Sequence, residues 1–299
     1  MYNMFRFAGM LIPRMPRWLV QALSRVIGVM AWLVASNARK QATMNMTHVL
    51  GTQVLATRAG RRRLRRTVRG MFQQTLNNYL VAFSLPYLRP ETLLRNIHVH
   101  DIEHLNAALA LGKGAIIFSA HLGPFEHLAH WLALKGYSMT IPVEHLKDER
   151  MLDLMLKLRR SHGVNFISLG GSAPIRALFS ALRSNQIVLI TADRAVVGES
   201  VEKLFFGATA RLPTGPALLA QRTGAALVGG FGWYGADTHI EAQFVPLSLE
   251  LPEEQRRDVA LLMDRIVEKM EHFIRAHPEQ WVVFSPIWTA PSTTVSVEA

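Results

Sequence analysis

Short apolar segments alternate with helical periodicity along residues 91–299. Strands alternating with helices of about 10–15 residues are typical of a mostly parallel sheet covered on both faces. We therefore predict an α/β fold with a central sheet flanked by helices. The expected strands are 115–120, 139–143, 164–169, 187–192, 225–234 and 239–247, the last antiparallel, and the expected helices are 124–135, 147–161, 173–184, 214–223 and 253–276.

The first 90 residues follow a different pattern. Two helices, 17–36 and 61–84, are expected on either side of a loop at 51–60. In the first helix the polar and small residues fall on one narrow stripe, and nearly all the others are large and apolar. The stripe consists of Arg17, Gln21, Ser24, Arg25 and Gly28.

The apolar run after Arg25 is too short for a membrane span, which needs about 20 residues. A secretory signal also fits poorly, because Arg25 splits the apolar region. The pattern favours an amphipathic helix lying in a membrane interface, with its basic residues towards the headgroups. A helix buried against the rest of the protein is the alternative. We treat 1–90 as a basic helical membrane-associating region and 91–299 as a catalytic α/β domain.

The charge distribution supports a membrane partner. The chain has a formal net charge of +11, and residues 1–90 hold 14 Lys and Arg but no Asp or Glu. The remaining residues carry 19 basic against 22 acidic side chains. A basic block attracts anionic lipid or nucleic acid. The apolar content of the block favours anionic membrane lipids over nucleic acid. Overall, 49% of residues are hydrophobic and no cysteine is present, which excludes disulfides and thiolate chemistry.

The segment 118–131, FSAHLGPFEHLAHW, places a histidine at the end of an expected strand. Glu126 follows His121 after four residues, and His127 and His130 come next. Zinc helices need histidines four residues apart with the glutamate beside the first, and this spacing differs. A histidine with a carboxylate suits general-base activation of a hydroxyl. An ordinary hydrogen-bonded strand-end histidine is the alternative, and His127 and His130 are expected to be ordinary helix residues.

A second expected strand, 187–192, ends at Asp193 and Arg194. Ligands in open α/β sheets bind beyond the carboxyl ends of the strands, so these residues are candidates for substrate binding. Arg194 could hold an anionic group, or it could form an ion pair with Asp193 or another acidic residue. Arg159, Arg160 and Arg211 are further candidate substrate-binding arginines. Residues 170–172, Gly-Gly-Ser, could bind an anion or form a plain strand–helix turn.

The segment H-L-G-P-F-E resembles the H-x4-D/E signature of the glycerolipid and lysophospholipid acyltransferase superfamily. Residues 193–227 narrow the resemblance to the branch with the lipid A late acyltransferases and the phosphatidylinositol mannoside acyltransferases, and the latter are closer. There a D-R is followed by V-E-x-x-F-F-G and a P-x-G-P-A helix start. N-M-T-H-V-L-G at 45–51 also matches, so the resemblance covers most of the chain.

The resemblance implies transfer of a fatty acyl chain from acyl-CoA or acyl carrier protein to a hydroxyl of a glycolipid or lysophospholipid. It makes His121 the base, Glu126 the motif acid and Glu202 a glutamate that contacts the histidine. Which of the two glutamates orients His121 stays open. Lys203 and Leu204 depart from the family pattern. We expect no cofactor and no metal, and a location at the cytoplasmic face of the plasma membrane.

Two other functions compete with this one. A metal-dependent lipid hydrolase would use the histidine cluster, and sensitivity to a chelator would reveal it. A catalytically inactive lipid-binding module could share the fold. The intact histidine–carboxylate motif argues against the inactive module.

Overall fold

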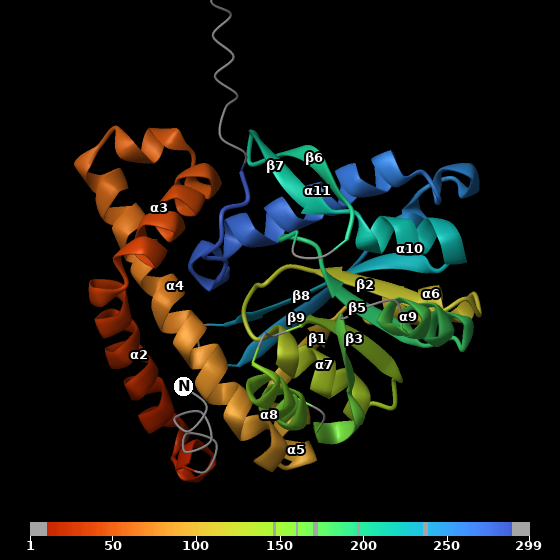
Figure 1. The fold of residues 1–299 in the computed structure, drawn as a ribbon, viewed down its shortest axis with the longest axis horizontal. Coiled ribbons are helices and arrows are strands. Elements are labelled where there is room, and N and C mark those ends of the chain that lie inside the picture. Colours follow the sequence, from red (N-terminus) through yellow and green to blue (C-terminus); the bar gives the residue numbers. More distant parts are fainter. Residues whose placement is uncertain are drawn as a thin grey trace, which may run out of the picture.

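A computed structural model describes residues 11–145, 148–159, 161–169, 173–195, 198–235 and 239–288. Its centre is a seven-stranded sheet with the order β1-β9-β8-β2-β5-β3-β4 (Figure 1). Neighbouring strands are parallel except β8 and β9, which are antiparallel. The predicted α/β fold and the late antiparallel strand are confirmed. The strands are β1 (Ile97–His100), β2 (Ala115–Ser119), β3 (Met139–Glu144), β4 (Asn165–Leu169), β5 (Ile187–Thr191), β8 (Ala226–Tyr234) and β9 (Ile240–Pro246).

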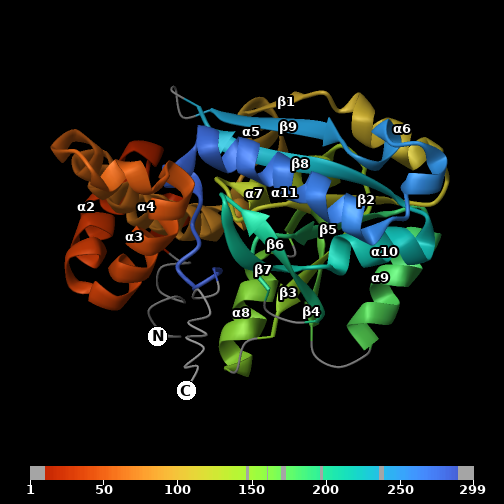
Figure 2. The same ribbon diagram turned by 90° about the horizontal axis from the view of Figure 1, so that it is seen from above.

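Helices cover both faces of the sheet. Figure 2 shows α10 and α11 on one side of it, and Figure 1 shows α7 and α8 below the strands. The helices of the α/β part are α5 (Pro90–Arg95), α6 (Glu103–Ala110), α7 (Phe125–Leu134), α8 (Glu149–Arg159), α9 (Ala173–Arg183), α10 (Gly215–Thr223) and α11 (Val259–Ala276).

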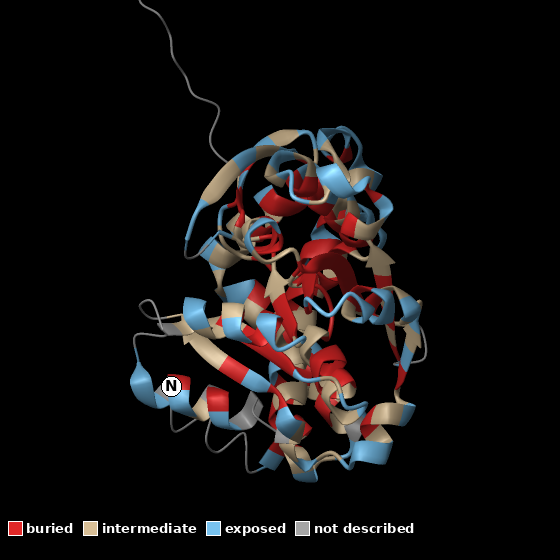
Figure 3. Ribbon diagram, turned by 90° about the vertical axis from the view of Figure 1, so that its right-hand side faces the viewer, coloured by how far each residue is buried: buried red, intermediate tan, exposed pale blue. Residues whose placement is uncertain are grey.

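The central strand β2 is buried on both sides, as its unbroken apolar run requires. Alternate side chains enter two different hydrophobic clusters. Ile116 and Phe118 pack in the cluster with α9, α10 and α11, and Ile117 packs in the cluster with α6, α7 and α8. Figure 3 shows this buried layer running through the middle of the molecule between exposed outer helix surfaces.

Within the described residues, the first three α-helices lie together at one end of the molecule (Figures 1 and 2). They are α2 (Arg17–Val34), α3 (Ser36–Leu50) and α4 (Arg58–Ser84). The α4 helix begins three residues earlier than predicted, because the Thr57 side chain caps it by accepting a hydrogen bond from the Gly60 amide at 2.9 Å. Met46 of α3 and Met71 of α4 share a buried cluster with α11. The N-terminal helices therefore pack onto the α/β part.

The α2 helix packs on α4 through part of its polar and small stripe. Ser24 and Gly28 are buried, and a Cβ atom on Gly28 would lie 2.6 Å from the Gln73 Cα atom of α4. Part of the polar and small stripe is therefore a packing surface. Large apolar side chains are left on the outside, with Val34 80% exposed and Trp18 69% exposed. We call this set the outer face of α2: Trp18, Val26, Met30, Leu33 and Val34.

Within the described residues, none of the helices alone has the length and apolar character to cross a membrane. The α2 and α3 helices, bent by 97° at their junction, meet that criterion only as a pair.

Several elements differ from the prediction. The short strand β1 and the helix α6 were not expected, and neither was a hairpin of β6 (Ser200–Phe205) and β7 (Ala208–Pro213). The long C-terminal helix begins at Val259 instead of 253. Asp258 caps it by accepting hydrogen bonds from the Ala260 and Leu261 amides, which fixes the later start.

Candidate active site

The register of two neighbouring strands brings His121 and Asp193 together. The strands β2 and β5 are adjacent and parallel, with Ser119 opposite Thr191. The Ala192 amide donates to the Ser119 carbonyl at 2.8 Å, so the pairing continues one step beyond the strands. One further step places His121 opposite Asp193.

Two hydrogen bonds join these residues. The His121 ring atom Nδ1 lies 2.8 Å from Asp193 Oδ1, and the His121 backbone amide donates to Asp193 Oδ2 at 2.8 Å. The Asp193 side chain is fully buried, whereas that of His121 is 26% exposed. With Nδ1 held by a carboxylate, the ring nitrogen left for proton transfer is Nε2.

The buried carboxylate of Asp193 is ionised. Burial alone raises its pKa, but the charge and hydrogen bonds of His121, together with a hydrogen bond from Trp281, outweigh burial. The pKa of Asp193 therefore lies below its ordinary value. Because an ionised carboxylate can only accept, Nδ1 of His121 is the donor of the ring hydrogen bond.

A sharp turn connects His121 to α7. Gly123 has a positive φ of 52°, and a Cβ atom there would lie 2.4 Å from the Gly232 carbonyl oxygen. Only glycine fits this approach of the turn to β8. The Phe125 ring, in the first turn of α7, packs edge-on against His121 with ring centroids 5.8 Å apart. The turn thus fixes the histidine at the mouth of the space beside it.

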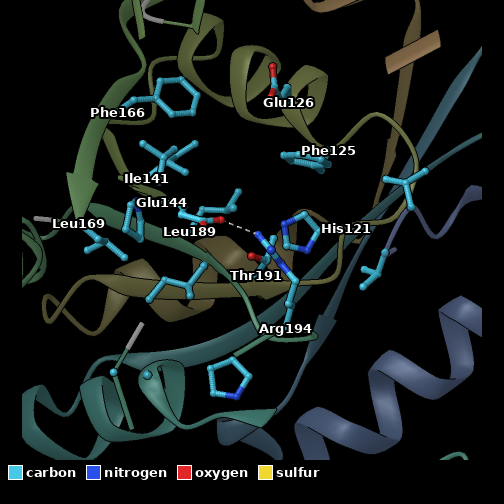
Figure 4. A pocket seen from close by; sticks show the side chains of 18 of the residues that line it. His121, Phe125, Glu126, Ile141, Glu144, Phe166, Leu169, Leu189, Thr191 and Arg194 are labelled. Atoms are coloured by element: carbon cyan, nitrogen blue, oxygen red, sulfur yellow. Dashed lines mark hydrogen bonds and ion pairs between the residues drawn. The ribbon is translucent and has the colours of Figure 1, made fainter. Parts of the chain in front are cut away.

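His121 opens onto a cavity of about 710 Å³, which we call the apolar cavity. Figure 4 shows Ile141, Phe166, Leu169 and Leu189 lining it beside His121. Further apolar side chains come from α8 and α9, including Leu152, Leu156 and Leu178. This volume is in the range of small-molecule sites, about 300–1,000 Å³.

Glu126 lies in the first turn of α7 and also lines the apolar cavity. In Figure 4 its carboxylate points away from His121. The carboxylate hydrogen-bonded to the His121 ring is that of Asp193, a residue that the sequence analysis assigned to substrate binding. Glu126, in the first turn of α7, lies at the positive end of the helix dipole, which favours an acidic side chain.

Arg194 forms an ion pair with Glu144 at the end of β3, with Nη2 and Oε2 2.8 Å apart. This outcome matches the ion-pair alternative, although the partner is Glu144 and not Asp193. Arg159 is the last residue of α8. Arg160 and the candidate anion-binding residues 170–172 lie outside the described residues.

The hairpin β6–β7 carries Glu202 and Arg211 opposite one another. Both side chains are exposed. Glu202 is not among the described residues that line the apolar cavity with His121. Arg211 lines a second space of about 480 Å³, the polar cavity, together with Arg194, Ser200 and Trp288. Arg194 borders both cavities and so links them.

The histidines after Glu126 are buried in α7. His130 is fully buried and packs edge-on against the His162 ring, with centroids 5.4 Å apart. In the described part of the chain, no three His, Asp or Glu side chains are grouped as metal ligands. The cluster that the hydrolase alternative needs is therefore not formed by these residues.

The pairing of Asp193 with His121 was not predicted from the sequence, and Trp281 was not among the candidate residues. The signal for the first was present, because each of the two residues directly follows the end of an expected strand. Using it required the knowledge that β2 and β5 are neighbours, although β3 and β4 lie between them in the chain.

The chain resembles known proteins over most of its length. Residues 3–290 match the model of the bacterial lipid A biosynthesis acyltransferase family. A phosphatidylinositol mannoside acyltransferase of Mycobacterium tuberculosis is 31% identical over 213 residues, which cover 70% of this chain and 66% of that protein, slightly less than two thirds of its length. A phosphatidylinositol mannoside acyltransferase of Mycolicibacterium smegmatis is 29% identical over 211 residues, covering 70% of this chain and 68% of that protein. The chain therefore belongs to the bacterial lipid A biosynthesis acyltransferase family.

Proposed function

We propose that the protein is a membrane-associated O-acyltransferase, which moves a fatty acyl chain from a thioester to a hydroxyl of a glycolipid. The observation that carries the proposal is the His121–Asp193 pair at the mouth of a large apolar cavity. Family membership and the names of the two relatives support it.

In this mechanism His121 Nε2 takes the proton of the acceptor hydroxyl while the hydroxyl oxygen attacks the thioester carbonyl carbon. The new C–O ester bond forms, the C–S bond breaks, and the imidazolium returns its proton to the leaving thiolate. Asp193, held ionised by its hydrogen bonds, orients the ring and stabilises the imidazolium. Glu126 and Glu202 are then left to act on the substrates or the surrounding loops.

The apolar cavity is suited to the acyl chain. Burial of an alkyl chain contributes about 0.8 kcal/mol per methylene, so a chain of a dozen methylenes gains on the order of 10 kcal/mol. Its mouth at His121 would hold the thioester carbonyl next to Nε2. We propose acyl-CoA or acyl carrier protein as the donor.

The polar cavity is suited to a polar, anionic group. Arg211 and Arg194 line it, and guanidinium groups bind phosphate in a bidentate manner. The acceptor of the relatives, as their names state, is a phosphatidylinositol mannoside. We therefore propose a phosphatidylinositol mannoside-like or lipid A-like acceptor, with a lysophospholipid as a further substrate to test. Arg159 and Arg160 are proposed to assist in headgroup binding.

The outer face of α2 is proposed to lie in the bilayer interface. Large exposed apolar patches mark sites of interaction with protein or membrane. Arg25 and Lys40 are exposed on the same helical region and can attract anionic headgroups. Such an enzyme would meet its lipid acceptor at the cytoplasmic face of the plasma membrane.

The test is a transfer assay with purified protein. Labelled acyl-CoA or acyl carrier protein is offered with phosphatidylinositol mannoside, a lipid A precursor or a lysophospholipid in mixed vesicles, and the products are identified by mass spectrometry. Acylated acceptor is the expected product. Release of free fatty acid from lipid, with no acceptor acylated, would contradict the proposal and favour a hydrolase.

A further inference from the structure

The chain that follows α11 returns across the turn that connects His121 to α7, which we call the catalytic turn. Trp281 is fully buried and forms an antiparallel bridge with Leu122. The Gly123 amide donates to the Gln280 carbonyl at 2.9 Å, and the Val282 amide donates to the His121 carbonyl at 2.9 Å. Residues 280–282 therefore hold the backbone of the catalytic turn from the C-terminal side.

Trp281 also reaches the buried carboxylate. Its indole Nε1 donates to Asp193 Oδ2 at 2.7 Å. The same oxygen accepts from the His121 amide, and the other oxygen, Oδ1, bonds the His121 ring. Asp193 thus accepts these three hydrogen bonds, and the Trp281 indole is the donor among them that does not belong to His121.

The indole ring itself is held by aromatic neighbours. Phe205 of the hairpin and Trp288 both pack edge-on against it, with ring centroids 6.2 Å and 6.3 Å away. The Trp288 indole donates instead to the Phe205 carbonyl at 2.8 Å. Trp281 is therefore fixed in both position and orientation before any substrate binds.

We propose that Trp281 is a positioning residue, whose indole N–H locks Asp193 in the orientation that holds the His121 ring. The assignment rests on the proposed function in so far as it concerns rate. Two donors on Oδ2 prevent rotation of the carboxylate, because rotation would break charge-assisted hydrogen bonds in a site that water does not reach. Oδ1 is then kept facing Nδ1, and Nε2 is kept facing the apolar cavity.

The first experiment follows the hydrogen bond directly by NMR, in protein labelled with ¹⁵N at tryptophan. The isosteric change Asp193→Asn should shift the Trp281 indole resonance upfield, because a neutral amide oxygen is a weaker acceptor than a carboxylate. The Trp288 resonance, bonded to a backbone carbonyl, should stay in place. An unmoved Trp281 resonance would overturn the proposal, and this measurement does not depend on any enzymatic activity.

The second experiment removes the donor with Trp281→Phe, with Trp288→Phe as the matched control. In Trp281→Phe the His121 Nδ1 proton resonance should move or broaden, and kcat should fall about ten- to hundredfold with KM unchanged. Trp288→Phe should leave the His121 resonance in place. Trp281→Phe combined with Asp193→Asn should be no slower than Asp193→Asn alone.

Each outcome is decisive. Multiplying rate losses in the double variant, or a changed KM with normal kcat, would show that Trp281 only supports the local fold and would overturn the proposal. Absence of acyl transfer in the wild-type protein would defeat the proposed function instead. The Trp281 and His121 resonances would still decide the positioning role in that case.

Discussion

The outer face of α2 should supply a large part of the affinity for membranes, and two substitutions can test this. Met30 and Val34 lie one turn apart on that face and are 58% and 80% exposed. Replacing both with Glu removes apolar surface and adds two negative charges without touching the face that packs on α4.

The magnitude follows from the exposed fractions. Full burial of such a side chain contributes about 1.5–3 kcal/mol, so these two together contribute roughly 2–4 kcal/mol on insertion. Two acidic groups near an anionic surface cost roughly 1 kcal/mol each, by analogy with the attraction of basic groups. The total of about 4–6 kcal/mol corresponds to a loss of at least about a thousandfold in the partition coefficient.

Sedimentation with anionic vesicles measures this loss, and Ala107→Glu with Ala110→Glu is the matched control. Both alanines are exposed on α6, so the control changes the net charge equally on a different surface. The control should bind vesicles nearly as the wild type does. Equal binding by the Met30→Glu, Val34→Glu variant and the control would refute the role of the outer face. Wild-type binding that ignores lipid charge and salt would refute the attraction of the basic residues to anionic headgroups.

Four further predictions concern the two cavities, the metal requirement and the buried carboxylate. Val143→Phe, which narrows the apolar cavity, should lower kcat/KM for a long-chain donor at least about tenfold relative to a short-chain donor, and equal losses would contradict an acyl site. Arg211→Gln should raise the KM for the glycolipid acceptor several-fold, whereas the control Arg183→Gln, at an exposed position on α9, should not. Full activity should survive dialysis against EDTA. Because the pKa of Asp193 is lower in the folded than in the unfolded state, its stabilisation is complete above about pH 4 and is lost as pH falls through the folded value. Urea unfolding of Asp193→Asn should therefore lose less stability than the wild type between pH 7 and pH 3, and parallel losses would contradict this.

Much of the fold was predictable because hydrophobic periodicity reports burial. The unbroken apolar run of β2 and the alternation in β9 both indicated their environments. The strand β1, with the sequence IHVH, alternates in the same way but has only 4 residues, which is too short to give a clear signal. The exposed strand positions of the hairpin β6–β7 mix charged, polar and apolar side chains, namely Glu202, Arg211, Thr209 and Leu204. Its polarity pattern therefore does not follow burial, and it was expected as a loop.

The site was only partly predictable, because its central contact depends on strand order. His121 could be identified from its place at a strand end. Its pairing with Asp193 depends on β5 crossing back beside β2, which local patterns do not encode. The faces of α2 show a similar limit. An amphipathic pattern separates two surfaces but does not say which one packs, and here Gly28 and Ser24 face α4 because small side chains allow close helix contact.

The most direct test of the account compares acyl transfer by His121→Ala, Asp193→Asn and the double variant, with Glu126→Gln and Glu202→Gln as comparisons. If Asp193 acts through the His121 imidazole, each single change at the pair should lower kcat about 10²–10⁴-fold, and the double variant should be no slower than His121→Ala. Glu202→Gln should have a much smaller effect, because the carboxylate hydrogen-bonded to the His121 ring is that of Asp193. Near-normal transfer by His121→Ala, or a loss in Glu202→Gln equal to that in Asp193→Asn, would contradict the mechanism.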